Sequence, residues 1–191
     1  MSSVVLTGDT SGSVTLTVPL VAGSNTATLA AATGTHFPFS AGTAVNSTSG
    51  TSIDFTSIPS WVKRITVIWN GVSTSGSSSP LVQLGTSGGV VTSGYGGTGS
   101  LIASTVSSQN FTTGFGERSQ DSAAVRSGSW SITNVSGNIW VCSGVLGRSD
   151  GANTSVTGGT VTLGGTLDRV RITTVNGTDT FDAGSINILF E

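Results

Sequence analysis

Charged residues are scarce in this chain of 191 residues and make up only 8% of the sequence. Seven Lys and Arg stand against nine Asp and Glu, and Lys63 is the only lysine. The net charge of -2 and the scattered cations exclude a basic patch, so we expect no nucleic-acid partner. Free β-proteins usually protect their sheet edges with lysine and other charges, so the scarcity of charge favours a surface that identical neighbours cover.

Cysteine and histidine are rarer still, with one of each. Cys142 has no partner for a disulfide within the chain, and its place in the apolar stretch 138–146 predicts a buried thiol. His36 alone cannot supply the ligands of a zinc site. Serine is too common for any one residue to stand out as the nucleophile of a triad with His36. We therefore expect no bound metal, no cofactor and no enzymatic activity.

Long apolar runs are also missing. No run approaches the roughly 20 residues that a membrane-spanning helix needs. The opening Met1-Ser2-Ser3 has neither the charged nor the apolar region of a secretion signal. The sequence thus predicts a soluble chain without membrane insertion or a leader.

The pattern that is present has the period of a β-strand. Gly, Ser, Thr and Val interrupt every window long enough to hold an amphipathic helix. Apolar residues alternate in two runs: Ile65, Val67 and Trp69, and Ile186, Ile188 and Phe190. Such alternation is typical of strands buried on one face. Seven or eight short strands separated by turns predict an all-β fold, a sandwich or a barrel.

The chain divides into two parts in this interpretation. Residues 13–18, SVTLTV, and a strand that begins at Asn25 predict a hairpin, which needs a partner because a lone hairpin is marginally stable. Residues 33–51 are poor in alternation and rich in small residues, as in a linker or an extended stalk. We place the boundary near Gly50, with a β-hairpin and stalk or attachment segment in 1–50 and a β-sandwich in 51–191.

Two segments resemble parts of a known class of proteins. The stretch SIDFTSIPSWVKRITV and the closing DRVRITTVNGTDTFDAGSINILFE resemble the C-terminal β-sandwich of bacteriophage tail fibres and other virion structural proteins. This resemblance covers roughly residues 50–191. Upstream, residues 8–35 resemble the short β-repeat that phage fibre proteins use ahead of such a domain, although a Pro usually stands where this chain has Ala30. The resemblance favours a jelly-roll arrangement of the antiparallel β-sandwich.

The same resemblance implies a function and a location. It implies a virion protein, made in the host cytoplasm, that forms a homotrimer, joins other virion proteins through its N-terminal segment and contacts a host glycan or surface protein. Our leading hypothesis is a non-enzymatic short tail fibre for receptor binding. A head fibre, decoration protein or adaptor with a purely structural role is one alternative, and a polysaccharide depolymerase is another.

Residues 85–129 are where the strand pattern fails, with many glycines and isolated aromatic residues. Loops of this length in compact domains are usually functional or disordered. Tyr95 and Phe115 stand among glycines there, so each is either a surface contact for a receptor or a plug for one end of the sandwich. Arg118 in the same segment is a third candidate for receptor contact. Arg118 and Arg126 are also expected to form solvated or inter-subunit ion pairs with Glu117 and Asp121.

Carboxylates offer the remaining chemistry. A glycosidase needs two carboxyl groups that face each other across a sugar, and the sequence holds two close pairs. These pairs are Glu117 with Asp121, and Asp179 with Asp182. Both pairs stand among turn residues, where Asp commonly caps its own backbone. Calcium at the second pair, or at Asp150 with Asn153, would lack the ligand density of a dedicated loop.

Two further groups of residues have open interpretations. Arg169 and Arg171 share one parity of a strand, so they are either solvated or paired with a neighbouring subunit. Asp54, Asp168 and Asp182 are the available acidic partners. The tryptophans Trp69 and Trp140 stand in apolar runs and are expected in the core, and Trp61 is expected to pack at the corner 58–60.

Overall fold

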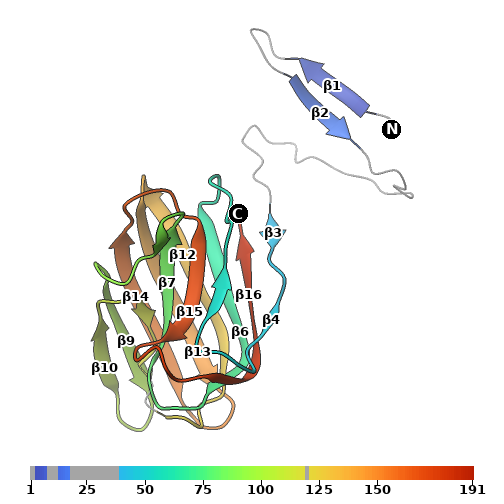
Figure 1. Ribbon diagram of the computed structural model, residues 1–191. Coiled ribbons are helices and arrows are strands. Elements are labelled where there is room, and N and C mark those ends of the chain that lie inside the picture. The colour runs from blue at the N-terminus through green and yellow to red at the C-terminus, as the bar shows by residue number, and fades with distance from the viewer. Residues whose placement is uncertain (1–2, 8–12, 18–38, 119–120) are drawn as a thin grey trace. The chain divides into compact units, whose positions relative to one another are not determined.

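Strands are the regular elements of this protein. The computed structural model describes residues 3–7, 13–17, 39–118 and 121–191, and none of these residues is helical. The described chain therefore offers no helix that is long and apolar enough to cross a membrane. The chain divides into two compact units, Met1–His36 and Phe37–Glu191. The expectation of an all-β protein is confirmed (Figure 1).

The first unit contains one antiparallel hairpin. Strand β1 (Ser3–Thr7) pairs with β2 (Ser13–Thr17), from Ser3 opposite Thr17 to Thr7 opposite Ser13. The predicted strand at residues 13–18 is thus confirmed, but its partner lies upstream. The apolar run of β1 and the Gly- and Ser-containing sequence that follows it are the hairpin signal that our interpretation passed over. The strand predicted from Asn25 lies outside the described residues, as does His36.

The second unit contains two antiparallel sheets. The larger has nine strands in the order β10-β9-β14-β13-β12-β6-β16-β3, with β4 also paired to β16. Its strands are β3 (Ser40–Ala41), β4 (Val45–Asn46), β6 (Arg64–Thr74), β9 (Gly96–Ile102), β10 (Ser107–Phe111), β12 (Arg126–Ser136), β13 (Ile139–Arg148), β14 (Thr154–Thr162) and β16 (Phe181–Phe190).

The smaller sheet has five strands in the order β11-β7-β15-β5, with β8 paired to β7. Its strands are β5 (Ile53–Phe55), β7 (Pro80–Thr86), β8 (Gly89–Val90), β11 (Phe115–Gly116) and β15 (Arg169–Thr174). The chain crosses between the sheets several times, and consecutive strands stay in one sheet at β3-β4, β7-β8, β9-β10 and the β12-β13-β14 meander. The jelly-roll connectivity stays a prediction.

One apolar core lies between the two sheets. The alternating residues Ile65, Val67 and Trp69 of β6 are at most 1% exposed and face this core. They pack in one cluster with residues of the smaller sheet such as Val170 and Ile172 of β15. Burial of both inner faces in a single cluster is the property of a β-sandwich. The predicted antiparallel β-sandwich is therefore confirmed.

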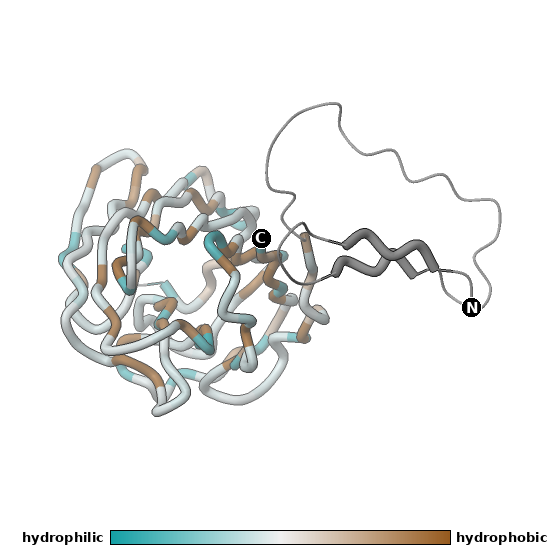
Figure 2. Tube along the Cα trace, turned by 90° about the horizontal axis from the view of Figure 1, so that it is seen from above, coloured by the Kyte–Doolittle hydropathy of each residue, from teal (hydrophilic) through white to brown (hydrophobic). Residues whose placement is uncertain are grey.

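The last strand follows its predicted alternation too. Ile186 and Ile188 of β16 are buried, and Phe190 is partly buried with its ring 5.9 Å from that of Trp61. Seen from above, much of the trace has the intermediate hydropathy of Gly, Ser and Thr, and strongly hydrophilic positions are few (Figure 2). The scarcity of charge thus belongs to the whole sandwich rather than to one region.

The boundary expected near Gly50 is wrong, because the sandwich unit begins at Phe37. Strands β3 and β4 both pair with β16. Between the two strands, the amide of Gly42 donates to the carbonyl of Ile188 at 2.8 Å. Just after β4, the amide of Ser47 donates to the carbonyl of Gly184 at 2.9 Å. These backbone bonds need no apolar alternation, so the expected stalk gave no sequence signal of its pairing.

The irregularity expected for residues 85–129 is also wrong, because β8 to β11 and the start of β12 lie there. Glycines conceal the strand pattern. A Cβ on Gly99 would meet the carbonyl oxygen of Gly116 at 2.5 Å, and one on Gly159 of β14 would meet the Cα of Gly97 at 2.8 Å. Glycine is thus required by close backbone approach, which removes the side chains that would have alternated.

Gly144 of β13 provides a test of this packing. A Cβ there would lie 2.1 Å from Cδ1 of Trp130 and 2.8 Å from its backbone Cα. We expect Gly144→Ala to lower the free energy of unfolding by about 1–3 kcal/mol, because overpacking forces the buried ring to move. Denaturant unfolding followed by tryptophan fluorescence measures the change.

Gly164→Ala is the matched control, since a Cβ at Gly164 would meet nothing within 4 Å. Both substitutions reduce the entropy of the unfolded chain equally, so the difference between their free energies of unfolding reports the clash with Trp130. Equal stability of the two variants would contradict the packing of Trp130 against Gly144.

Candidate functional site

Tyr95 and Phe115 are buried, at 4% and 1% exposed, so the prediction of a surface contact for them is wrong. Their rings pack edge to face with centroids 5.1 Å apart at 87°. The Tyr95 hydroxyl accepts a hydrogen bond of 2.7 Å from the amide of Leu84. The other interpretation, in which these aromatics plug the sandwich, agrees with their place in the core cluster. Sequence could not separate the two, because flanking glycines carry no information on burial.

Arg118 lies half-buried just after β11. Its Nε is buried and has no hydrogen-bond partner among the residues that the structure describes. Its assignment as a receptor contact stays a prediction.

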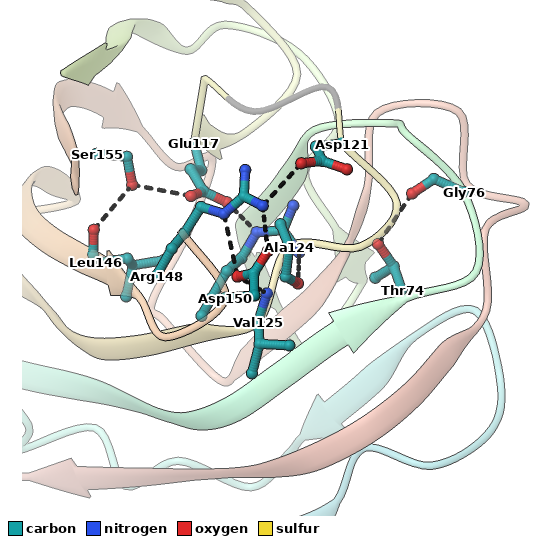
Figure 3. Close-up of polar contacts among 11 residues, drawn as sticks. Thr74, Gly76, Glu117, Asp121, Ala124, Val125, Leu146, Arg148, Asp150 and Ser155 are labelled. Atoms are coloured by element: carbon teal, nitrogen blue, oxygen red, sulfur yellow. Dashed lines mark hydrogen bonds and ion pairs between the residues drawn. The ribbon is translucent and has the colours of Figure 1, made fainter. Parts of the chain in front are cut away.

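Glu117 and Arg126 form a buried ion pair, with both side chains 1% exposed. The Ser155 hydroxyl of β14 donates to Oε1 of Glu117 at 2.9 Å, and NH1 of Arg126 donates to the carbonyl of Ala124 at 3.0 Å. Figure 3 shows the hydroxyl of Ser155 directed at the carboxylate of Glu117. The expectation of solvated or inter-subunit pairs in this segment is wrong for Glu117 and Arg126, because β12 carries Arg126 into the interior.

Arg148, at the end of β13, joins two carboxylates. Its NH2 donates to Oδ2 of Asp121 at 2.7 Å, and it also binds Asp150 (Figure 3). Hydrogen bonds from Arg148 lower the pKa of both carboxyls below the ordinary range. Asp150 further accepts from the amide of Val125 at 2.8 Å. This network holds the segment before β12 against the end of β13.

The two carboxylate pairs make hydrogen bonds and ion pairs within the fold. Glu117 is fully buried against Arg126, so a sugar has no access to it. Asp179 accepts from the amide of Ser78 at 2.9 Å and from Nδ2 of Asn176 at 2.6 Å, while Asp182 binds the hydroxyl of Ser73. Within the described chain, no group of three His, Cys, Asp or Glu residues lies close enough to hold a metal ion.

The paired arginines of β15 bind acidic residues of their own chain. Nε and NH2 of Arg171 donate to the two oxygens of Asp54 at 2.7 and 3.0 Å. NH2 of Arg169 binds Asp168 at 3.0 Å. Both expected alternatives, solvation and an inter-subunit pair, are therefore replaced by intrachain pairs, because β5 lies next to β15 and brings Asp54 opposite Arg171.

The tryptophans and the cysteine lie where the sequence predicted. Trp69 and Trp140 are 1% and 3% exposed, and Trp61 packs against Phe190. Cys142 is buried, which raises the pKa of its thiol to about 12 and keeps it protonated at neutral pH.

A pocket of about 340 Å³ lies on the outer face of the smaller sheet, and the sequence analysis missed it. Gln83 of β7 and Arg171 of β15 lie opposite each other on its floor, next to the pair of Leu81 and Thr173. Two loops cover the floor: Nε2 of Gln83 donates to the carbonyl of Thr113 at 2.7 Å, and the Thr173 hydroxyl donates to the carbonyl of residue 51 at 2.8 Å. The polar Gln83 inside the apolar run 80–84 was the available signal.

The polar pocket, as we call it, is walled by residues that are themselves fixed. Asn176 in the loop after β15 accepts hydrogen bonds from the hydroxyl of Thr174 at 2.8 Å and from the amide of Thr178 at 3.0 Å. Its own Nδ2 donates to Asp179. The carboxylate of Asp179 thus orders a wall of the pocket and is not an isolated acid.

Comparisons with known proteins identify no relative. A scan against protein-family models, a search of the curated proteins and a search of the solved structures each find no match to this chain. The class that fold and site define is therefore an antiparallel β-sandwich with a polar surface pocket. The resemblance to phage fibre proteins stays a prediction.

The buried ion pair yields a prediction for stability. We expect Glu117→Gln to lower the free energy of unfolding by about 3–5 kcal/mol, because it leaves the charge of Arg126 buried without its counter-ion. Glu191→Gln is the control, since Glu191 pairs with the exposed Arg64 and should cost less than about 1 kcal/mol. Equal losses for the two variants in denaturant unfolding would contradict the burial of the pair.

Tyr95 yields a prediction for alkaline pH. Burial raises the pKa of its phenol to about 12, and it is the only tyrosine in the chain, so tyrosinate absorbance reports it alone. The neutral phenol contributes its full stability below about pH 10, the ordinary pKa, and this contribution is lost as the pH rises through about 12. We expect the native protein to titrate near 12 and the denatured chain near 10; a native value near 10 would place Tyr95 on the surface.

Proposed function

We propose that this chain is a non-enzymatic virion protein, a short tail fibre whose sandwich assembles as a homotrimer and binds the host surface. In this proposal the N-terminal segment joins other virion proteins, and the sandwich meets a host glycan or surface protein. The virion part rests on the sequence resemblance of residues 50–191. The observation that carries the self-assembly is the uncharged outer face of the larger sheet.

Hydroxyls, glycines and small apolar groups make up the outer face. Val145 of β13 lies opposite Val156 of β14 on one side and Ser129 of β12 on the other. The next outward row runs through Gly158, Ser143 and Ser131. We call the outward positions of β9, β14, β13, β12 and β6 the uncharged face.

Charges in these strands and in β16 are confined to strand ends. They are Arg64, Arg126, Arg148 and Asp182. Arg126 is buried, and Arg64 is bound to Glu191. Arg64 is the one charged residue at an outward position of the uncharged face; it lies at the end of β6 and pairs with Glu191. No charge in the middle of the face therefore has to be stripped of water when two copies meet, which favours contact between identical surfaces.

The size of the uncharged face suits a specific interface. Five strands spaced about 4.8 Å apart, each about nine residues long, cover roughly 700 Å². Standard interfaces bury about 800 Å² per partner. Exposed Val141, Val145 and Val156 supply apolar area near its middle. A trimer that shares this face would also present three copies of any binding site on the remaining surface.

Charge introduced on the uncharged face tests the assembly. We expect the native chain to have a solution mass near three times that of one chain, and Val145→Lys to shift it to the monomer, because a buried unpaired ammonium opposes association. Val145 is 50% exposed, so the substitution spares the core. Light scattering measures the mass.

Val106→Lys is the matched control, since Val106 is 63% exposed in the loop between β9 and β10. It should leave the mass unchanged. A native monomer, or a Val145→Lys variant with unchanged mass, would overturn the assembly proposed through this face. Saturable binding of the native protein to host cells tests the receptor role, and a chain that ignores cells favours the purely structural alternative.

A further inference from the structure

The polar pocket contains hydrogen-bonding groups that protein partners leave unfilled. Gln83 is only 7% exposed. A Cβ on Gly114 would lie 3.0 Å from Cγ of Gln83, so the aliphatic part of the Gln83 side chain is held by close packing against Gly114. Nε2 donates to Thr113, whereas Oε1 has no partner among the described residues. Oε1 is not among the buried polar atoms that lack a partner, so it stays open to hydrogen bonding by water or by a ligand in the pocket.

Arg171 supplies the complementary donors. Asp54 holds Nε and NH2 of its guanidinium and leaves NH1 without a partner in the described part of the chain. The pair has no net charge, because the carboxylate neutralises the guanidinium. Arg171 therefore offers an oriented N–H donor at the pocket without the excess positive charge that an anionic ligand needs.

Hydroxyl groups complete the pocket. The Thr173 hydroxyl uses its proton on the carbonyl of Thr51 and keeps an acceptor site. Thr92 and Ser52 stand at the rim with exposed or partly exposed side chains. Donors and acceptors thus both line a cavity of about 340 Å³, within the range of about 300–1,000 Å³ for small-molecule sites.

We infer that the polar pocket binds one residue of a neutral saccharide. Adjacent sugar hydroxyls each donate and accept, so one ring can donate to Oε1 of Gln83 while it accepts from NH1 of Arg171. No aromatic side chain lines the pocket, so no ring is available to stack on the sugar. The affinity of a single site is accordingly low, with a Kd of about 1 mM. The inference rests on the proposed function, in which a host glycan is the receptor, and adds its site and chemical class.

Saturation-transfer NMR on the full chain tests this inference. The probes are the methyl glycosides of glucose, galactose, mannose and N-acetylglucosamine, with glucuronic acid as the anionic comparison. We expect transfer to at least one neutral probe and none to glucuronate. Gln83→Met keeps the stem and removes the amide, so it should weaken binding about tenfold or more.

A rim substitution keeps the test independent of folding. Thr92→Arg places a long side chain over the pocket from an exposed position and should abolish transfer. Thr105→Arg is the matched control, because Thr105 is exposed in the loop between β9 and β10 and does not line the pocket. It should leave transfer unchanged. Absence of transfer to every neutral probe, stronger transfer to glucuronate, or full transfer in Thr92→Arg would each overturn the inference.

Cell attachment separates this inference from the proposed function. If the native protein and its Thr92→Arg variant attach to host cells equally well, the sugar site in the pocket is overturned and the receptor role stands. A chain that binds a neutral glycoside, loses it in Thr92→Arg and ignores cells would support the pocket and overturn the receptor role.

Discussion

The sandwich depends on glycine at positions where a neighbouring backbone or aromatic ring occupies the space that a side chain would need. Trp130 occupies the space that a side chain on Gly144 would need, and Phe111 lies against Gly116 so closely that a Cβ there would be 2.3 Å from its ring. Trp130 covers a glycine of the neighbouring strand, and Phe111 of the larger sheet covers a glycine of the smaller sheet, so both rings supply buried area that the glycines lack. A chain with 28 glycines and few aromatics can thereby still bury a single continuous core.

The few charges of this protein mostly serve its own architecture. Glu117 follows β11 of the smaller sheet, whereas its partners Arg126 and Ser155 belong to β12 and β14 of the larger one. The pair therefore connects the two sheets, and the Arg148 network with its two aspartates fixes the segment that leads into β12. A buried pair adds little net stability compared with apolar packing, but the loss of one partner is costly. Its main consequence is that the connection between the sheets takes one arrangement.

Sequence reasoning predicted the fold where side chains alternate and failed where backbone alone makes the contacts. The runs at Ile65 and Ile186 predicted their strands and inner faces, since apolar period-two patterns follow directly from burial. The strands between residues 85 and 129 carry glycine at the contact points, and β3 and β4 pair through backbone groups, so neither left a pattern. The polar pocket is assembled from β7, β15 and four further segments, at residues 51–52, 92, 113 and 175–177, and such long-range proximity has no local signal in one sequence.

The two outer faces of the sandwich have different chemistry, and the proposed function uses that difference. The uncharged face carries mostly Ser, Thr, Gly and Val, and in the proposed function it suits contact with identical copies. The smaller sheet instead presents a pocket whose polar groups are oriented by Asp54 and Thr113. A single pocket without an aromatic platform binds a sugar weakly, so stable adhesion requires several pockets at once. In the proposed trimer, association through one face would make the pocket on the other face effective, because three linked sites would raise the effective concentration of glycan at each of them.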